Sequence, residues 1–335
     1  MFKGHLILFL LLILSWNIGF ATETFKPFSD RKEVRQFILE MHKKHGLDKK
    51  TLTTLFKEYG PEQKILDTMS KQYEALPWFK YKNLIVTKER IKEGVLFWKQ
   101  NEASLKNAEK TFGVPAEIIV AIIGLETSYG KKMGNYPLIQ SLATLAFNYP
   151  HRADFFRGEL EHFLLLVHEG ILDAKTAKGS FAGAIGIPQF MPSSYRRFAV
   201  DFSGKGKRDL LCNNSDAIGS VANYLSLHGW KPKEHIVHKA RVFGTLHEKI
   251  VSTKSEKPNL SLGDLAKHRV KLHTPRIMTD KTKKVNLIAL QKSEKSKEHW
   301  IGLHNFYVIT RYNHSIHYAM AVHQLSQQIR TEKQG

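Results

Sequence analysis

The sequence predicts an α+β fold that is predominantly α. Apolar residues recur at helical spacing along much of the 335 residues, and the long apolar run between Pro115 and Gly130 is typical of a buried helix. Residues 232–302 break this pattern, because prolines separate short apolar runs such as Val285 to Leu290. We therefore expect a mainly helical chain that carries one small β-rich module or elaborated insertion.

The helices are expected at intervals along the whole chain. Residues 30–75 predict short amphipathic helices, because Val34, Phe37, Ile38 and Met41 fall at helical spacing. Pro77-Trp78 marks a break. Later helices are expected through Val95 to Leu105, through the apolar run that carries Glu126, and over residues 137–147, 153–168 and 216–227.

The last part of the chain predicts a strand followed by a helix. Between Asn305 and Tyr312, Phe306, Val308 and Thr310 alternate with the intervening side chains, which is the period of a strand. The remaining residues have helical spacing.

Glu126 is the first candidate for a catalytic group. It ends the apolar run Ile118–Leu125, and Gly130 suits the position just past a helix end. A carboxyl group there is poorly solvated and faces the negative end of the helix dipole, and both effects favour its protonated form. Such a group can act as a general acid near neutral pH. From spacing alone, the alternative is a glutamate that simply reaches solvent where the helix ends.

A glycine-rich stretch from Lys178 to Tyr195 is the second candidate for a functional segment. Its three glycines, two prolines and small residues fit no regular element. Loops of this composition let the backbone approach a ligand closely.

The first 21 residues are typical of an export signal. Lys3 and His5 precede the apolar stretch Leu6–Phe20, and small residues precede the expected cleavage after Ala21. An uncleaved membrane anchor is the alternative, although the stretch is short for a spanning helix. The single cysteine, Cys212, excludes an internal disulfide and lies too far from the signal for lipoprotein processing. We expect a soluble chain outside the cytoplasm.

The formal net charge is +20. Residues 231–300 carry seventeen Lys and Arg against seven Asp and Glu, a balance of +10. In a cytosolic protein this charge would indicate nucleic acid. For an exported chain, contact with anionic wall polymer or a membrane surface is expected instead, and a well-solvated surface is the alternative.

With these segments in view, the chain resembles the B-type bacterial lytic murein transglycosylases. The resemblance runs from Pro77-Trp78 to the terminal helix, and its densest segments are Phe112 through Gly130, Asn148–Pro150, Gly179–Tyr195, Asp201–Gly204, Asp216–Tyr224 and Asn305–Tyr318. It implies a lysozyme-like core, with a helical N-terminal domain and a small β-containing domain. The expected divisions are a signal peptide at 1–21, the N-terminal helical domain at 22–76, the core at 77–231, the basic β-rich domain at 232–302, and a strand and helix returning to the core at 303–335.

The resemblance also implies the chemistry. In this family the glutamate of the Glu-Thr-x-x-Gly segment is the sole catalytic carboxylate, which places that role on Glu126. It would protonate the oxygen between N-acetylmuramic acid and N-acetylglucosamine, and then take the proton of the muramyl 6-hydroxyl as the 1,6-anhydro ring closes. The same group acts first as acid and then as base, so one carboxyl suffices. The nearest downstream acids, Asp154, Glu159 and Glu161, are expected on a solvated helix face.

Other positions match substrate-contacting residues of the family, namely Ser180, Gln189, Phe190, Arg152, Tyr81, Tyr224, Tyr312, Asn313 and Tyr318. The resemblance gives the tyrosines flat faces suited to sugar rings. It places Phe190 in the wall of the saccharide site and Asn313 near the reacting N-acetyl group. Arg152 suits an anionic lactyl or peptide carboxylate.

Two segments depart from the family's pattern. His151 replaces the first member of a frequent arginine pair, and we expect an arginine there to bind the sacculus more tightly. The loop Asp201–Cys212 corresponds to an EF-hand-like loop, but Lys205 and Cys212 stand where acidic groups are usual. We expect the Lys205 ammonium group to replace the ion partly against Asp201 and Asp209.

No cofactor and no catalytic metal are expected, because the histidines lack the spacing of a zinc site. Glycan strands of peptidoglycan are the expected partner, nucleic acid is not, and a monomer is expected. Two alternatives to the lyase remain open. One is a hydrolytic muramidase in which water replaces the 6-hydroxyl, and the other is a non-catalytic scaffold that binds peptidoglycan.

Overall fold

Helices dominate the structure, a computed structural model that describes residues 26–70, 76–274, 280 and 282–335. The expected export signal lies outside the described residues. In chain order the elements are η1 (Phe28–Asp30), α1 (Lys32–His45), α2 (Lys49–Lys57), α3 (Gln63–Ser70), α4 (Trp78–Ile85), α5 (Lys88–Gln100), α6 (Glu102–Phe112), α7 (Ala116–Thr127), β1 (Tyr136–Pro137), α8 (Leu138–Asn148), η3 (Pro150–Arg152), α9 (Ala153–His168), β2 (Lys178–Gly179), α10 (Pro192–Phe198), α11 (Asn214–Leu227), β3 (Val237–Val242), η4 (Leu246–Ile250), α12 (Leu262–Lys267), β4 (Val270–Leu272), β5 (Asn286–Ser293), β6 (Ser296–Gly302), α13 (His304–Tyr312) and α14 (Ile316–Gln334).

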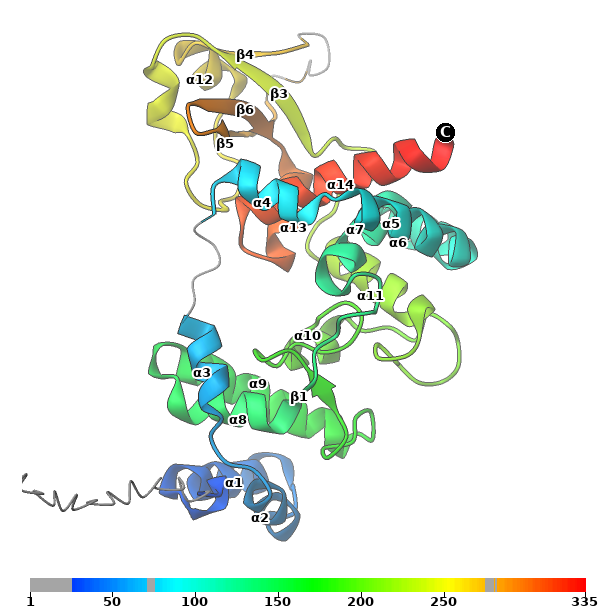
Figure 1. Ribbon diagram of the computed structural model, residues 1–335, viewed down its shortest axis with the longest axis vertical. Helices are drawn as coiled ribbons and strands as arrows, with labels where there is room; N and C mark the ends of the chain where they lie inside the picture. The colour runs from blue at the N-terminus through cyan, green and yellow to red at the C-terminus, as the bar shows by residue number, and fades with distance from the viewer. Residues whose placement is uncertain (1–25, 71–75, 275–279, 281) are drawn as a thin grey trace, which may run out of the picture.

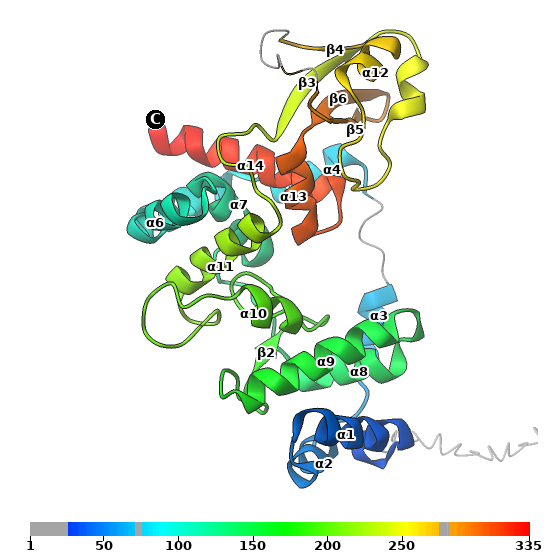
Figure 2. The ribbon, with the colours of Figure 1, turned by 180° about the vertical axis from the view of Figure 1, so that it is seen from behind.

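The molecule is elongated, with the N-terminal helices at one end and the β-sheet at the other (Figures 1 and 2). Helices α1, α2 and α3 lie against α8 and α9. The Arg31 guanidinium donates to Asn148 Oδ1 at 2.7 Å, and the Phe37 and Phe147 rings meet at 5.8 Å. Helices α7 and α11 lie between the two ends.

The β-rich module predicted at residues 232–302 is a four-stranded antiparallel sheet. Its strand order is β4-β3-β6-β5, and α12 precedes its edge strand β4. The sheet has its own small hydrophobic cluster, which includes Leu265, Val285 and Ile301. The larger cluster joins the N-terminal helices to the rest of the helical part, from Phe28 to Ile329.

The strand expected over Asn305–Tyr312 is wrong, because these residues form the helix α13. A strand with one buried face would hide only alternate side chains. Here Val308 and Ile309 are both fully buried, and Asn305 and Phe306 are buried one turn earlier. Burial at these positions has the period of a helix. Packing against the core therefore overrides the strand preference of the β-branched residues.

Helix α7 lies at the centre of the helical part and contacts α5, α6, α11 and α14. All its side chains from Ile118 to Ile123 are buried, which explains why its sequence is apolar on every side. Gly124 follows, and an added Cβ there would meet the ring of Tyr129. The glycine thus lets the Tyr129 ring lie directly over the end of the helix.

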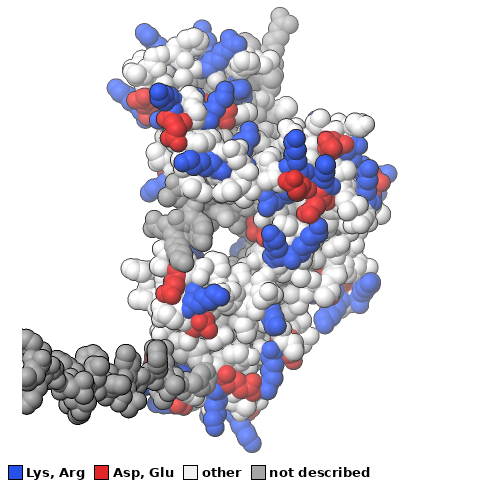
Figure 3. Space-filling model, in the orientation of Figure 1, with Lys and Arg blue, Asp and Glu red and all other residues white. Residues whose placement is uncertain are grey.

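Lys and Arg side chains are spread over the whole face seen in Figure 3, and that face is hollowed between its upper and lower halves. Within the described ranges, no helix combines the length and apolarity that crossing a bilayer requires.

Candidate active site

Glu126 is the second-last residue of α7, as its position in the apolar run predicts. The chain turns away sharply after Thr127, because Ser128, Tyr129 and Gly130 all have positive φ angles of 48°, 61° and 85°. The Tyr129 hydroxyl donates to the carbonyl of Arg90 at 2.7 Å, which fixes this turn on α5. Glu126 is therefore held at a defined point where the buried helix ends.

Thr127 connects the end of α7 to the glycine-rich loop. Its side chain is fully buried, and its hydroxyl donates to the carbonyl of Ile187 at 2.8 Å. The same oxygen accepts a hydrogen bond from the N–H of Gly130 at 2.9 Å. One side chain thus joins the helix, its terminal turn and the loop 180–191.

The carboxyl group of Glu126 is partly buried and has one hydrogen-bond donor. The Tyr318 hydroxyl donates to Glu126 Oε1 at 2.6 Å and is the only donor to this carboxyl group among the described residues. Burial raises the pKa of Glu126 from its ordinary value of 4.5 to about 7, although the Tyr318 hydrogen bond favours the ionised form. The group can therefore hold its proton near neutral pH and also release it.

Aromatic rings form a continuous wall next to Glu126. The Tyr312 ring lies parallel to that of Tyr318, at 9° and 6.4 Å between centres. Tyr312 in turn contacts Tyr224 at 4.9 Å and Phe190 at 5.9 Å. The Tyr312 hydroxyl donates to the carbonyl of Pro188 at 2.6 Å, so this wall is fixed to the glycine-rich loop. Phe190 is only 2% exposed, and its ring packs against those of Tyr224 and Tyr312.

Tyr81 extends this wall from α4. Its ring contacts Trp78 at 6.2 Å and His317 at 5.7 Å, and its charge state influences the pKa of Tyr318. Tyr81 thus belongs to the same aromatic group as Tyr318, whereas Tyr224 lies at the other end of the wall.

Ser180 and Gln189 shape the glycine-rich loop. The Ser180 hydroxyl accepts from the N–H of Ala184 at 3.0 Å. The Gln189 side-chain amide donates to the carbonyls of Gly186 and Met133 at 2.8 and 3.1 Å. Between them the chain folds back on itself, because Ile185 pairs with Phe190. Gly186 has a φ of +68°, and an added Cβ there would meet the carbonyl of Leu210, which explains the need for glycine.

Arg152 and Asn313 are exposed. The Arg152 guanidinium stacks on Phe155 at 4.2 Å, at the start of α9. Burial lowers the pKa of His314, and the charges of Arg311 and Arg152 lower it further. Arg152 is thus within electrostatic reach of the residue that follows Asn313. His151, beside Arg152, is exposed and meets the Tyr149 ring edge-on at 5.9 Å.

The expectation of a solvated face for the acids of α9 is only partly right. Asp154 is exposed, and Glu161 pairs with Lys44 and His45 at 2.8 and 2.9 Å. Glu159, in contrast, is 5% exposed, and both its oxygens accept hydrogen bonds from Ser193. All three carboxyl groups therefore lie outside the contacts that link Glu126 to its tyrosines.

The loop Asp201–Cys212 is closed by its own backbone. Asp201 accepts from the N–H groups of Lys205 and Gly206, and Asp209 accepts from those of Leu211 and Cys212. Asp216 accepts from two further N–H groups of this loop. The ammonium group of Lys205 has no ion-pair partner in the described part of the chain, so the expectation that it replaces an ion was wrong.

This loop does not fit a calcium ion. Calcium needs several free oxygen ligands with enough negative charge. Here both oxygens of Asp201 and Oδ1 of Asp209 already accept backbone hydrogen bonds, and Lys205 and Cys212 add no side-chain oxygen. Among the described residues, no cluster of three or more His, Cys, Asp and Glu side chains is arranged to hold a metal ion.

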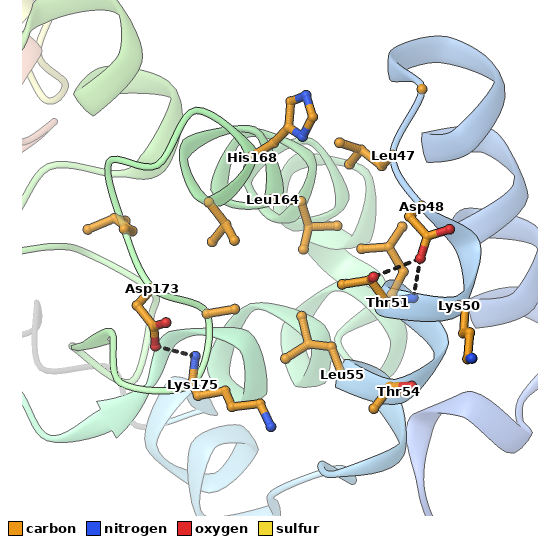
Figure 4. A pocket seen from close by; sticks show the side chains of 15 residues that line it. Leu47, Asp48, Lys50, Thr51, Thr54, Leu55, Leu164, His168, Asp173 and Lys175 are labelled. Atoms are coloured by element: carbon orange, nitrogen blue, oxygen red, sulfur yellow. Dashed lines mark hydrogen bonds between the residues drawn. The ribbon is translucent and has the colours of Figure 1, made fainter.

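A pocket of about 750 Å³ lies far from Glu126, between α2 and α9 (Figure 4). Its floor is apolar, with Leu47, Leu55 and Leu164. Its two carboxylates accept hydrogen bonds from nearby backbone N–H groups, Asp48 from Thr51 and Asp173 from Lys175. It therefore lacks converging polar groups that could perform chemistry, and we do not assign it to the active site.

Two residues that support the site carry no signal in the sequence. Thr127 bonds to a carbonyl sixty residues away, and a threonine at a helix end carries no signal for that contact. The His317 ring contacts the rings of Trp78 and Tyr81 at tilted angles, with 5.6 and 5.7 Å between centres. Its neighbours come from α4, so only the folded structure reveals its place.

Comparisons with known proteins identify the family of this chain. The family model described as "Transglycosylase SLT domain" matches residues 29–327. The chain is 39% identical over 317 residues to the membrane-bound lytic murein transglycosylase B of Escherichia coli K12, which covers 90% of this chain and 84% of that protein.

Solved structures are similar over most of the chain. The catenated lytic transglycosylase SltB1 of Pseudomonas aeruginosa is 42% identical with a TM-score of 0.86, covering 91% of this chain and 99% of SltB1. Slt35 of Escherichia coli, solved in complex with calcium, is 39% identical with a TM-score of 0.84, covering 93% and 96%. SltB3 of Pseudomonas aeruginosa, solved in complex with NAG-NAM-pentapeptide, is 28% identical with a TM-score of 0.78, covering 89% and 79%.

These similarities confirm the predicted fold class and family resemblance, and relatives of this chain bind peptidoglycan fragments. The chain is a member of the transglycosylase SLT domain family.

Proposed function

We propose that this protein is a lytic transglycosylase that cleaves the bond between N-acetylmuramic acid and N-acetylglucosamine in peptidoglycan, with Glu126 as its single catalytic carboxyl group. The observation that carries the proposal is the setting of Glu126, partly buried at the end of α7 with one tyrosine donor and a pKa of about 7. A carboxyl group of this pKa can both give and take a proton at neutral pH.

The reaction proceeds in two proton transfers. Glu126 donates its proton to the glycosidic oxygen, and the bond to the muramyl anomeric carbon breaks. The N-acetyl group of the substrate stabilises the cation that develops there. The ionised Glu126, held by the Tyr318 hydroxyl, then accepts the proton of the muramyl 6-hydroxyl as its oxygen attacks the anomeric carbon. The product ends in a 1,6-anhydro ring, and no water is consumed.

The remaining residues of the site bind and orient the glycan. The rings of Tyr318, Tyr312 and Tyr81 offer faces against which sugar rings pack. Ser180, Gln189 and Asn313 supply polar contacts, while Phe190 and Tyr224 support the wall. Arg152 pairs with an anionic group of the substrate, since its residue is exposed and its guanidinium contacts only aromatic rings among the described residues.

The protein acts outside the cytoplasm, in the periplasm, after the signal is removed behind Ala21. Basic residues between 231 and 300 add contacts to the wall or a membrane surface.

The hydrolytic alternative requires a second carboxyl group that activates water. No described carboxyl group other than Glu126 is bound to the tyrosine wall, and Glu159 is fully engaged by Ser193. This arrangement favours the lyase. A scaffold that only binds peptidoglycan would have no need for a carboxyl group of raised pKa in its cleft.

Mass spectrometry of the products from purified sacculi tests the proposal. The mature protein should release muropeptides with a 1,6-anhydro end, one water lighter than hydrolysis products, and Glu126→Gln should release none. Reducing-end products would identify a hydrolase, and binding to sacculi without any product would identify a scaffold.

A further inference from the structure

A second cavity, of about 730 Å³, lies between α9, α10 and α11. Its lining is rich in basic groups: His162, Glu169, Ser193, Ser194, Arg196, Arg197, Phe198, Arg208, Tyr224 and His228. Three arginines and one glutamate give the cavity a formal charge of +2 with both histidines neutral. A concave site with this excess is suited to an anionic group.

The arginines differ in how far they are neutralised. Arg196 binds Glu169 Oε1 through two nitrogens, at 2.7 and 3.1 Å, and its charge is largely balanced. Arg208 approaches the other oxygen of Glu169 only to 3.9 Å. Arg197 has no ion-pair partner in the described ranges, and its guanidinium lies 5.1 Å from the Phe198 ring. Arg197 and Arg208 therefore retain donors for an external anion.

Tyr224 connects this cavity to the active site. Its ring stacks on His228 at 4.0 Å on the cavity side and contacts Tyr312 at 4.9 Å on the side of the catalytic wall. Tyr312 lies 6.4 Å from Tyr318, which holds Glu126. The rings of Tyr224, Tyr312 and Tyr318 thus connect the cavity to Glu126.

We propose that this cavity binds a carboxylate of the peptide stem on a muramyl residue, with Arg197 and Arg208 as its donors. The proposal rests on the proposed function, because only a peptidoglycan substrate carries such stems. A stem of three to five residues starts at the lactyl group of the muramyl residue and spans at most about 10 to 18 Å when extended. A guanidinium group binds carboxylates through two parallel hydrogen bonds, so this contact selects strands that carry peptides.

Kinetics on two substrates test this assignment. The first substrate is peptide-bearing glycan from sacculi, and the second is the same glycan after an amidase has removed the stems. The ratio of kcat/KM for the first to that for the second should fall about tenfold in the double variant Arg197→Gln and Arg208→Gln. Arg157→Gln is the matched control, because Arg157 lies on α9, is 34% exposed and pairs with Glu40 far from the cavity.

Each outcome has a distinct meaning. An unchanged ratio in the double variant, with thermal unfolding like that of the wild type, would overturn the peptide site. An equal loss on both substrates would assign the arginines to general support of the fold or the glycan. Loss of binding to vesicles of anionic phospholipid, with an unchanged ratio, would assign them to lipid phosphate instead. If the wild type releases no 1,6-anhydro product from either substrate, the proposed function itself fails, which is a different result.

Discussion

Glu126 and Glu159 are glutamates in different regions of the molecule, and they differ in burial and in hydrogen bonds. Glu126 is partly buried, whereas Glu159 is 5% exposed. Glu126, at the end of α7, accepts one hydrogen bond from a tyrosine hydroxyl. Glu159, in the middle of α9, accepts from the Ser193 N–H at 2.8 Å and from the Ser193 hydroxyl at 2.6 Å. Ser193 lies in the first turn of α10, so Glu159 satisfies a free N–H of that helix.

The difference separates a carboxyl group that performs chemistry from one that supports the fold. Glu159 uses both oxygens to join α9 to α10, and protonation would remove an acceptor. Glu126 keeps one oxygen without a donor from the described residues, next to aromatic rings suited to sugars. Burial alone therefore does not identify a general acid. A raised pKa, together with an oxygen that has no donor among the described residues and a neighbouring wall of aromatic rings, indicates one.

The largest effect is expected on the rate. Glu126→Gln should reduce the release of muropeptides by about 10³-fold or more, because the amide cannot donate a proton to the glycosidic oxygen. Glu159→Gln should reduce the rate less than about tenfold. Turnover of purified sacculi by both variants measures this contrast. An equal loss of rate in the two variants would contradict this difference between Glu126 and Glu159.

The pH dependence of the free energy of unfolding should reveal the raised pKa of Glu126. The pKa of Glu126 is raised from 4.5 to about 7 on folding, so its contribution is fully present below pH 4.5 and is lost as the pH rises through 7. The free energy of unfolding of the wild type should therefore fall by about 3 kcal/mol across this window, relative to Glu126→Gln. Urea unfolding at pH 4.5 and pH 8 measures the difference. Parallel curves for the two proteins would contradict the raised pKa.

Tyr318→Phe tests the single hydrogen bond to Glu126. Loss of this donor should raise the pKa of Glu126 further, because the bond favours the ionised carboxylate. The rate at pH 7 should fall about tenfold, since the carboxylate that accepts the second proton is less well stabilised. The falling limb of the pH–rate profile should move to higher pH. A shift of this limb to lower pH would show that the Tyr318 hydroxyl does not stabilise the ionised form of Glu126.

Glu159 should matter for stability. Ser193→Ala removes the hydroxyl that donates to Glu159 Oε1 and should lower the free energy of unfolding by about 1 to 2 kcal/mol. Ser194→Ala, one residue further along α10, is the control, and its midpoint in urea should change less. Stability that is equal in Ser193→Ala and the wild type would show that Glu159 does not support the fold.

The carboxylates of the loop Asp201–Cys212 resemble Glu159 in their hydrogen bonds. Backbone N–H groups donate to Asp201 and Asp209, as Ser193 donates to Glu159. Calcium should therefore leave the thermal unfolding midpoint unchanged. Differential scanning fluorimetry with and without millimolar calcium measures this, with Asp201→Ala as the control. A rise in the midpoint that disappears in Asp201→Ala would show that the loop binds the ion.

Much of the helical fold could be predicted, because its signals are local. The buried helix α7 follows from an uninterrupted apolar run bounded by proline and glycine, and the position of Glu126 follows from it. The helix α13 could not be predicted, because Val308 and Ile309 favour a strand and only packing on both sides makes them helical.

The site could be predicted only in part, since most of its contacts join distant segments. Glu126 stands out by itself, but the roles of Tyr312 and Tyr318 came from the family resemblance. The bond from Thr127 to Ile187, the engagement of Glu159 by Ser193 and the arginine-lined cavity depend on how helices pack. No local pattern of residues carries that information.

The central claim is that Glu126 reacts in its protonated form, and the pH dependence of kcat/KM tests it most directly. The profile should fall at high pH with an apparent pKa of about 7, because ionised Glu126 cannot protonate the glycosidic oxygen. A kcat/KM that stays constant or rises from pH 6 to pH 9 would contradict the account.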